Sequence, residues 1–188
     1  MEMREHILAS AQRLAQQRGF NGFSYADIAD EVGIRKASLH HYFPTKTDLG
    51  LALIEVYSAQ FNSALLRISG SPSNAPEKLA AYVALYRGTL EADRMCLCGM
   101  FASEALTLDA VMLPKLERFF VRNTEWLSEI LATGKSQRLL KFSGAAADHA
   151  RMFLSALQGA LLIARATGDH EAFDQTASLL IAGLSRKG

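Results

Sequence analysis

Residues 24–49, SYADIADEVGIRKASLHHYFPTKTDL, decide the fold. The apolar positions in this segment are spaced so that two short helices, joined by a tight turn, close a small core between them. These positions are Ile28, Ala29, Val32, Ile34, Leu39 and Phe43. The segment therefore predicts a helix-turn-helix.

The second of these helices is unusual in its charge. From Val32 to Thr47 the chain has no acidic residue, whereas donors and aromatic rings occupy the positions that do not face the core. A short helix without negative charge and rich in donors suits the phosphates and the major groove of DNA. The alternative is a purely structural helical hairpin whose basic face is only solvated.

The same residues resemble the N-terminal domain of TetR-type transcriptional regulators. Ser24 stands at a Thr position of that pattern, and Ile28-Ala29 match directly. The remaining matches are Gly33-Ile34 in the turn, Leu39 and Phe43 in the core, Lys46 and Leu49 in the next helix, and an upstream apolar face of Ile7, Leu8, Ala11, Leu14 and Ala15 that ends at Gly19. The match spans about a quarter of the chain. Two positions depart from the pattern and bear on base preference: Arg35 replaces a small capping residue, and His40 stands where Tyr is common.

Almost every other segment of the chain is also predicted to be helical. We expect an all-α protein of about nine helices, with a three-helix DNA-binding domain over residues 1–47 and a helical effector-binding and dimerisation domain over residues 48–188. The stretch SGSPSNAP, residues 69–76, predicts a break between helices. A helix over residues 109–133 is expected to bend near Pro114.

The recognition helix is expected to run from about Arg35 to Phe43. Its first turn enters the major groove in helix-turn-helix proteins, which makes Arg35, Lys36, Ala37 and Ser38 the predicted base-reading residues. The full set of predicted DNA contacts also includes Ser24, Tyr25, His40, His41, Tyr42 and Lys46. The resemblance implies phosphate contacts for Ser24, Tyr42 and Lys46.

The resemblance further implies that a small molecule binds the C-terminal domain and releases the protein, usually a repressor, from a palindromic operator. The sequence does not identify the effector. Predicted pocket residues are aromatic, soft or isolated polar side chains: Tyr82, Tyr86, Cys96, Met100, Phe101, Phe119, Trp126, Met152 and Gln158. Ordinary core packing is the alternative for each of them.

The last two predicted helices have broad apolar faces that also contain small residues. In the resembling family such helices pair with their copies in a four-helix bundle, so a homodimer is expected. The predicted interface residues are Phe153, Leu157, Leu161, Phe173, Leu180 and Leu184. The alternative is that these residues only close the core of one protomer.

Two cysteines, Cys96 and Cys98, allow a second hypothesis for regulation. Arg94 nearby could lower a thiol pKa and produce a sensor of electrophiles or oxidants. The alternative, which the sequence favours, is a pair of inert buried thiols. We expect no metal site, because the pair is too small a ligand set and His40-His41 has no completing ligand. No catalytic residue and no cofactor are predicted, since no nucleophile elbow or phosphate-binding glycine loop occurs.

Composition agrees with a packed globular chain. The 188 residues carry a net charge of +1 and are 49% hydrophobic and 21% charged. The N-terminus enters a charged amphipathic helix directly, and the longest apolar run, residues 160–164, is far below the roughly 20 residues of a membrane span. We therefore expect a cytoplasmic protein without a membrane partner.

Overall fold

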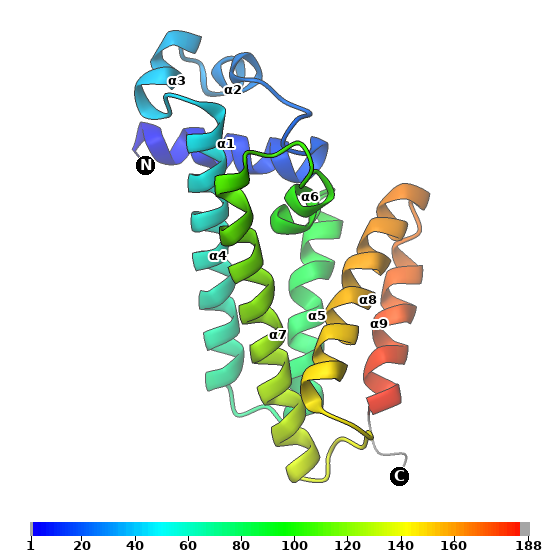
Figure 1. Cartoon of the computed structure of the whole chain (residues 1–188). Coiled ribbons are helices and arrows are strands. Elements are labelled where there is room, and N and C mark those ends of the chain that lie inside the picture. Colours follow the sequence, from blue (N-terminus) through cyan, green and yellow to red (C-terminus); the bar gives the residue numbers. More distant parts are fainter. Residues whose placement is uncertain (1, 185–188) are drawn as a thin grey trace. The chain divides into compact units, whose positions relative to one another are not determined.

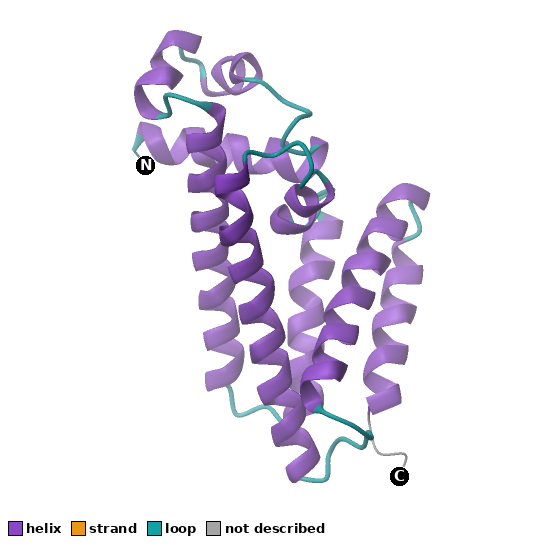
Figure 2. Ribbon diagram, viewed as in Figure 1, coloured by secondary structure: helices purple, strands orange, loops and turns teal. Residues whose placement is uncertain are grey.

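The structure is a computed structural model that describes residues 2–184. Within this range the regular structure is nine α-helices and one short 3₁₀ helix. Figures 1 and 2 show the helices and the loops that join them. The predicted all-α class is therefore confirmed.

The chain packs into two compact units. The first contains the residues up to Gln60 together with Cys96–Phe119, and the second contains Phe61–Met95 together with the residues from Phe120 onward. Two long helices, α4 (Lys46–Gly70) and α7 (Leu113–Ser136), begin in the first unit and end in the second.

The first unit is built from α1 (Met3–Arg18), α2 (Tyr25–Val32), α3 (Lys36–Tyr42), the start of α4, α6 (Leu97–Ser103), the 3₁₀ helix η1 (Ala110–Met112) and the start of α7. Its core contains the apolar residues that the helix-turn-helix pattern singles out. Ile7, Ala11, Ile28, Leu39, Leu49 and Leu53 are each fully buried. The spacing of apolar residues in the sequence therefore matches the inward faces of the helices.

Glycines end the first two helices of this unit. Gly33 closes α2 with a φ of +75°, a left-handed conformation that glycine adopts without a steric penalty. Gly19 closes α1 with a φ of +84°, and a Cβ there would lie 2.2 Å from Oε1 of Glu104. The turn after α1 therefore lies close against the residues that follow α6.

The second unit contains the ends of α4 and α7 with α5 (Ala75–Glu91), α8 (Ala146–Thr167) and α9 (His170–Leu184). Asn74 caps α5, because its side-chain Oδ1 accepts from the Glu77 amide at 3.0 Å while Glu77 accepts from the Asn74 amide at 2.8 Å. α8 and α9 form an antiparallel pair, and α5 packs on both. The rings of Phe153 and Phe173 are fully buried in this core.

Two helix predictions are corrected. The expected helix over residues 109–133 does not bend at Pro114; a 3₁₀ turn precedes it, and Pro114 is the second residue of α7. The first turn of a helix tolerates proline because its amide needs no intrahelical acceptor. The break between α4 and α5 is also shorter than residues 69–76, since helix continues to Gly70 and resumes at Ala75.

α4 is the one helix among residues 2–184 that is long and apolar enough to cross a membrane by length and composition alone. Core helices pass the same test. The apolar side chains of Leu49, Leu53, Ile54 and Leu65 are buried within the protein, which identifies α4 as a core helix.

Two helical glycines are expected to respond to substitution in opposite directions. A Cβ at Gly134 would lie 2.7 Å from Cβ of Ala75 and 2.6 Å from Cδ1 of Leu140, whereas nothing lies within 4 Å of a Cβ at Gly88. Gly134→Ala should lower the free energy of unfolding by about 1–2 kcal/mol, because overpacking outweighs the gain in helix propensity.

The matched variant Gly88→Ala should raise the free energy of unfolding by about 0.5–1 kcal/mol, because it restricts the unfolded chain and meets open space. Urea unfolding followed by circular dichroism measures both changes. Equal shifts in the two variants would show that the close packing at Gly134 is absent.

Candidate nucleic-acid interface

The helix-turn-helix is formed by α2, the turn at Gly33 and α3. Arg35 is the N-cap residue of α3, with an extended backbone that lets Lys36 begin the helix. Of the seven residues of α3, only Leu39 is buried. The predicted contacts Arg35, Lys36, Ala37, Ser38, His40, His41 and Tyr42 are all exposed, so they are available to a ligand on the outer side of α3.

The acidic groups that flank α3 are held by partners. Glu31 pairs with Arg13 of α1, and Asp48 accepts from the amide and hydroxyl of Thr45 at 2.9 and 2.7 Å. These contacts leave the acid-free segment between them as a basic surface. Such a surface attracts the phosphates of a nucleic acid.

Ser24 is exposed, and it also has a hydrogen-bond partner within the protein. Its amide and hydroxyl both donate to Oδ2 of Asp27, at 2.8 and 2.6 Å, which caps α2. These bonds, together with the Arg18 guanidinium, hold the pKa of the Asp27 carboxyl below its usual value. The hydroxyl predicted to contact phosphate is therefore already used in the cap.

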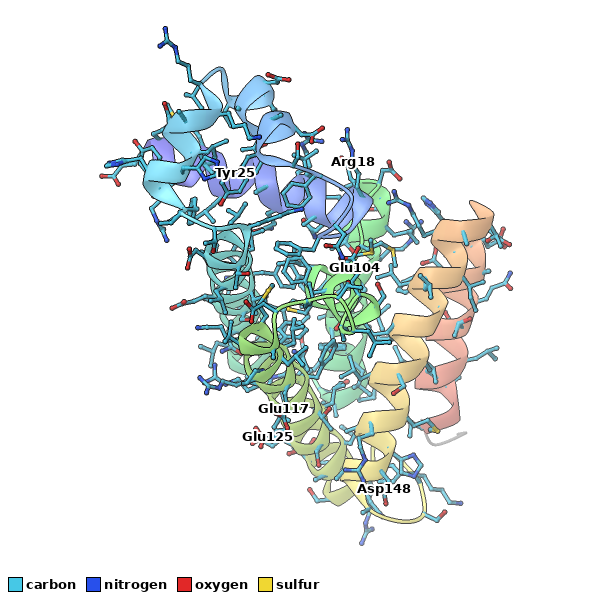
Figure 3. All side chains as sticks on the ribbon, turned by 45° about the horizontal axis from the view of Figure 1, so that its top comes forward. Arg18, Tyr25, Glu104, Glu117, Glu125 and Asp148 are labelled. Atoms are coloured by element: carbon cyan, nitrogen blue, oxygen red, sulfur yellow. The ribbon has the colours of Figure 1, made fainter. Side chains whose placement is uncertain are left out.

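Tyr25 differs from its prediction as a DNA contact. Its side chain is buried, and its hydroxyl lies 2.7 Å from the carbonyl oxygens of both Phe43 and Thr45 (Figure 3 labels Tyr25). Burial, followed by the charge of Asp48, raises the pKa of Tyr25 to about 12, so the phenol keeps its proton and donates it. Tyr25 positions the link between α3 and α4.

Lys46 also differs from its prediction. Its ammonium donates to the carbonyl oxygen of Phe23 and lies 4.9 and 4.6 Å from the ring centroids of Phe20 and Phe23. Partial burial lowers the pKa of Lys46, as expected for a cation removed from water. The side chain is thus turned inward, because the two rings and the carbonyl offer it a cation–π site and an acceptor.

The predicted effector residues are distributed over both units. In the second unit, Tyr82 stacks on Trp126 with centroids 5.3 Å apart, and its hydroxyl donates to Oδ1 of Asn123 at 3.0 Å and lies 3.1 Å from that of Tyr86. The sequence reasoning missed Asn123, which is 2% exposed. The sequence did carry a signal for Asn123, because a polar residue on the inner face of the amphipathic helix α7 is unusual.

Other members of the predicted pocket set have different surroundings. Phe101 contacts Phe20 with centroids 4.8 Å apart, and Phe119 contacts Tyr57 at 5.7 Å, both within the first unit. Met152 is 53% exposed on α8, so its prediction as a pocket residue is corrected. Gln158 is half-buried on α8, and Met100 is half-buried on α6.

Both thiols are buried and free. Cys96 and Cys98 are 1% and 0% exposed. Burial, followed by the neighbouring Cys96, raises the pKa of the Cys98 thiol well above its usual value, which is opposite to the activation expected from Arg94. Within residues 2–184 no cluster of three or more His, Cys, Asp or Glu side chains could hold a metal ion.

The predicted dimer residues are mostly core. Phe153, Leu157, Leu161 and Phe173 are fully buried and Leu184 is 4% exposed within one protomer, while Leu180 is half-buried. Five of the six therefore cannot form an interface, because the packing of α8 and α9 on α5 already covers them. The exposed apolar side chains of these two helices are Met152, Leu162, Ile163 and Leu179.

The chain is similar to known regulators along its length. The sequence profile of the bacterial regulatory proteins of the tetR family matches residues 7–53. The repressor NemR of Escherichia coli K12, an HTH-type transcriptional repressor, is 26% identical over 177 residues, which are 90% of this chain and 87% of NemR. The crystal structure of reduced E. coli NemR covers 99% of this chain and 98% of its own with a TM-score of 0.83.

Two solved structures are more similar in sequence. A TetR-family regulator from Agrobacterium tumefaciens is 32% identical, covers 98% of both chains and has a TM-score of 0.94. A TetR regulator from Legionella pneumophila is also 32% identical over 98% of both chains, with a TM-score of 0.87. With this identity over nearly the whole of both chains, and with the exposed acid-free helix described above, the chain belongs to the TetR family and is a DNA-binding transcriptional regulator.

Proposed function

We propose that this regulator is a homodimeric repressor that leaves a palindromic operator when a small molecule binds its C-terminal helices. The observation that carries the proposal is α3, whose exposed side chains include cations and no carboxylate. Arg35 and Lys36 lie at its N-terminus, the end that reaches base edges in helix-turn-helix proteins. An arginine there reads guanine through O6 and N7, and Ala37 suits a thymine methyl group.

The proposed functions of the two domains are those predicted from the sequence: residues 1–47 bind DNA, and residues 48–188 bind the effector and the second protomer. NemR is named a repressor, which supports the same direction of control here. The site of action is the cytoplasm, where the operator is, and the proposed role requires no catalysis.

The test of DNA binding is fluorescence anisotropy with the DNA that flanks the gene for this protein. Saturable binding to one palindromic stretch, with affinity that falls steeply as salt rises, supports the proposal. Equal and weak binding to a scrambled duplex at every salt concentration contradicts it for that DNA.

Two lysines are expected to differ in this assay. Lys36→Ala should reduce the slope of log affinity against log salt by up to about 0.9 for each protomer, because the DNA interface loses an exposed ammonium that displaces counterions. Lys46→Ala should leave the slope unchanged, because the Lys46 ammonium donates to the carbonyl oxygen of Phe23 and does not neutralise a phosphate. Arg122→Ala, which removes an exposed cation of α7, is the matched control. A larger slope change for Lys46→Ala than for Lys36→Ala would refute this assignment.

A twofold dimer is proposed through the exposed face of α8 and α9. Met152, Leu162 and Leu179 are 53%, 57% and 73% exposed, although they lie on helices whose other faces are core. A Cβ added at Gly159 or Gly183 meets nothing within 4 Å, so these helices present a smooth surface to a close partner. Exposed apolar surface of this kind marks an interface, and twofold symmetry places two α3 helices on half-sites about one helical turn apart.

The double variant Leu162→Glu/Leu179→Glu should be monomeric by sedimentation velocity, because four buried carboxylates per dimer would have to lose their hydration. It should also lose most of its operator affinity. Leu106→Glu is the control, because Leu106 is fully exposed in the first unit. A dimer that survives the double substitution would place the interface elsewhere.

Coupling of ligand to DNA is proposed to pass through the contact between α6 and the turn after α1. The Asn21 amide donates to Oε2 of Glu104 at 3.0 Å, and its side-chain Nδ2 donates to Oγ1 of Thr107 at 2.8 Å. α4, which begins at Lys46 directly after the DNA-binding helices, is the second part of the proposed link between ligand binding and DNA binding. A ligand acts only if it prefers one arrangement of these elements, so a tight ligand that leaves operator affinity unchanged would exclude this coupling.

A thiol sensor that uses Cys96 and Cys98 is the second candidate. The resemblance to NemR, whose reduced form has been crystallised, favours it, but the burial of both thiols argues for slow reaction at neutral pH. Replacement of both cysteines by serine separates the two hypotheses, because only a covalent sensor would lose its response.

Alkylation by iodoacetamide measures thiol reactivity directly. Because the folded pKa of Cys98 is raised, its thiolate fraction at pH 7–9 should be below that of an ordinary cysteine. The labelling rate of Cys98 in the Cys96→Ser variant should therefore be at least about tenfold lower than in the urea-unfolded chain and should still rise above pH 9. A rate that is high and flat between pH 6 and 8 would indicate a lowered pKa and support the sensor.

A further inference from the structure

α7 and α8 of the second unit form an open groove with a volume of about 550 Å³. Six of its lining residues carry the argument: Phe120, Val121, Glu125 and Glu129 of α7, and Ala147 and Arg151 of α8. The volume lies within the range of about 300–1,000 Å³ that is usual for small-molecule sites. Aromatic and aliphatic side chains with a few charged groups are also the usual composition of such sites.

The charges of the groove are unbalanced. Glu125 and Glu129 lie one turn apart on α7, both are exposed, and neither carboxylate has an ion-pair or hydrogen-bond partner among residues 2–184. Arg151 is the cation of the lining, but its guanidinium pairs with Asp148 at the start of α8 (Glu125 and Asp148 are labelled in Figure 3). The groove therefore combines apolar surface with two uncompensated negative charges.

We propose that this groove binds an organic cation with an apolar, aromatic body. The apolar side chains of Phe120, Val121 and Ala147 line the groove and provide contact for the body. The two carboxylates select a positive charge and disfavour an anion. A metal ion does not fit, since two exposed carboxylates are too few ligands and no third acidic, His or Cys side chain joins them within the described residues.

Binding of such a cation is a property of the groove itself. Its use as the effector rests on the proposed function. The two claims are separable, because ligand binding can be measured without DNA and operator affinity can be measured with and without ligand.

The probe is tetraphenylphosphonium, and tetraphenylborate is its isosteric anion. Isothermal titration of the full chain in sodium buffer should give saturable binding of the phosphonium, with a dissociation constant of roughly 10–1,000 μM as expected for an open groove. The borate should bind about tenfold more weakly or not at all, because exposed charge pairs contribute modestly and two carboxylates act together.

The variant Glu125→Gln/Glu129→Gln keeps the shape of both side chains and removes their charge. It should weaken phosphonium binding about five- to tenfold and bring the affinities of the two ions close together. Glu117→Gln is the matched control, because Glu117 is an exposed carboxylate of the same helix about two turns from Glu125 and outside the groove lining (Figure 3). Circular dichroism confirms that all variants are folded.

Three results would overturn the site: no saturable phosphonium binding, equal affinity for the borate in the native chain, or equal phosphonium affinity in the double variant and the native chain. Groove coverage by a second protomer would produce the first result. If the phosphonium binds as expected but operator affinity does not change in its presence, the site stands and only its role as the effector site is lost. If the chain binds no operator at all, the failure lies with the proposed function and not with the groove.

Discussion

The DNA-binding surface depends on the attachment of one short helix. α3 has seven residues, far fewer than an isolated helix needs for stability in water, so tertiary contacts hold it in place. Leu39 provides the buried anchor within the helix, and Phe43 follows at its end with 3% exposure. The Tyr25 hydroxyl then fixes the link to α4 by its contacts with two backbone carbonyls. Every other residue of α3 is left for the outer surface.

The packing of the first unit places α6 close to the turn that precedes the helix-turn-helix. The turn after α1 contacts Glu104 and Thr107 directly behind α6, and the buried thiols lie at the start of that same seven-residue helix. The residues after α6 are thus joined to the turn after α1 by hydrogen bonds and by close packing of the Glu104 side chain on Gly19, not by a long flexible linker. Packed elements of this kind transmit displacements because they leave little free volume to absorb them.

Much of this architecture could be predicted from the sequence, because apolar spacing and glycine positions reflect strong local constraints. The periodic residues Ile28, Leu39 and Leu53 are core, and Gly19 and Gly33 end helices as expected. The exposed surface of α3 also followed from its composition. Pro114 was misread because proline disrupts a helix interior but suits its first turn, and the exact start of a helix is poorly marked in a single sequence.

The differences at the sites have another cause. The family resemblance implies a phosphate contact for Lys46, and Tyr25 is among the predicted DNA contacts, yet both side chains find acceptors within the protein. Phe153 and Leu161 were expected at an interface because an apolar helix face is the same in sequence whether a neighbouring helix or a second protomer covers it. Only the three-dimensional packing separates the two cases, and it identifies Leu162 and Leu179 as the exposed members.

The single anchor of α3 also has an evolutionary consequence. Because Leu39 alone among its seven residues is buried, most substitutions on the outer side of this helix change no core contact. Exposed positions of this kind usually alter stability by less than about 0.5 kcal/mol. Gene duplicates of this protein could therefore acquire new operator preferences one residue at a time while keeping the fold, so that DNA specificity and stability are free to diverge.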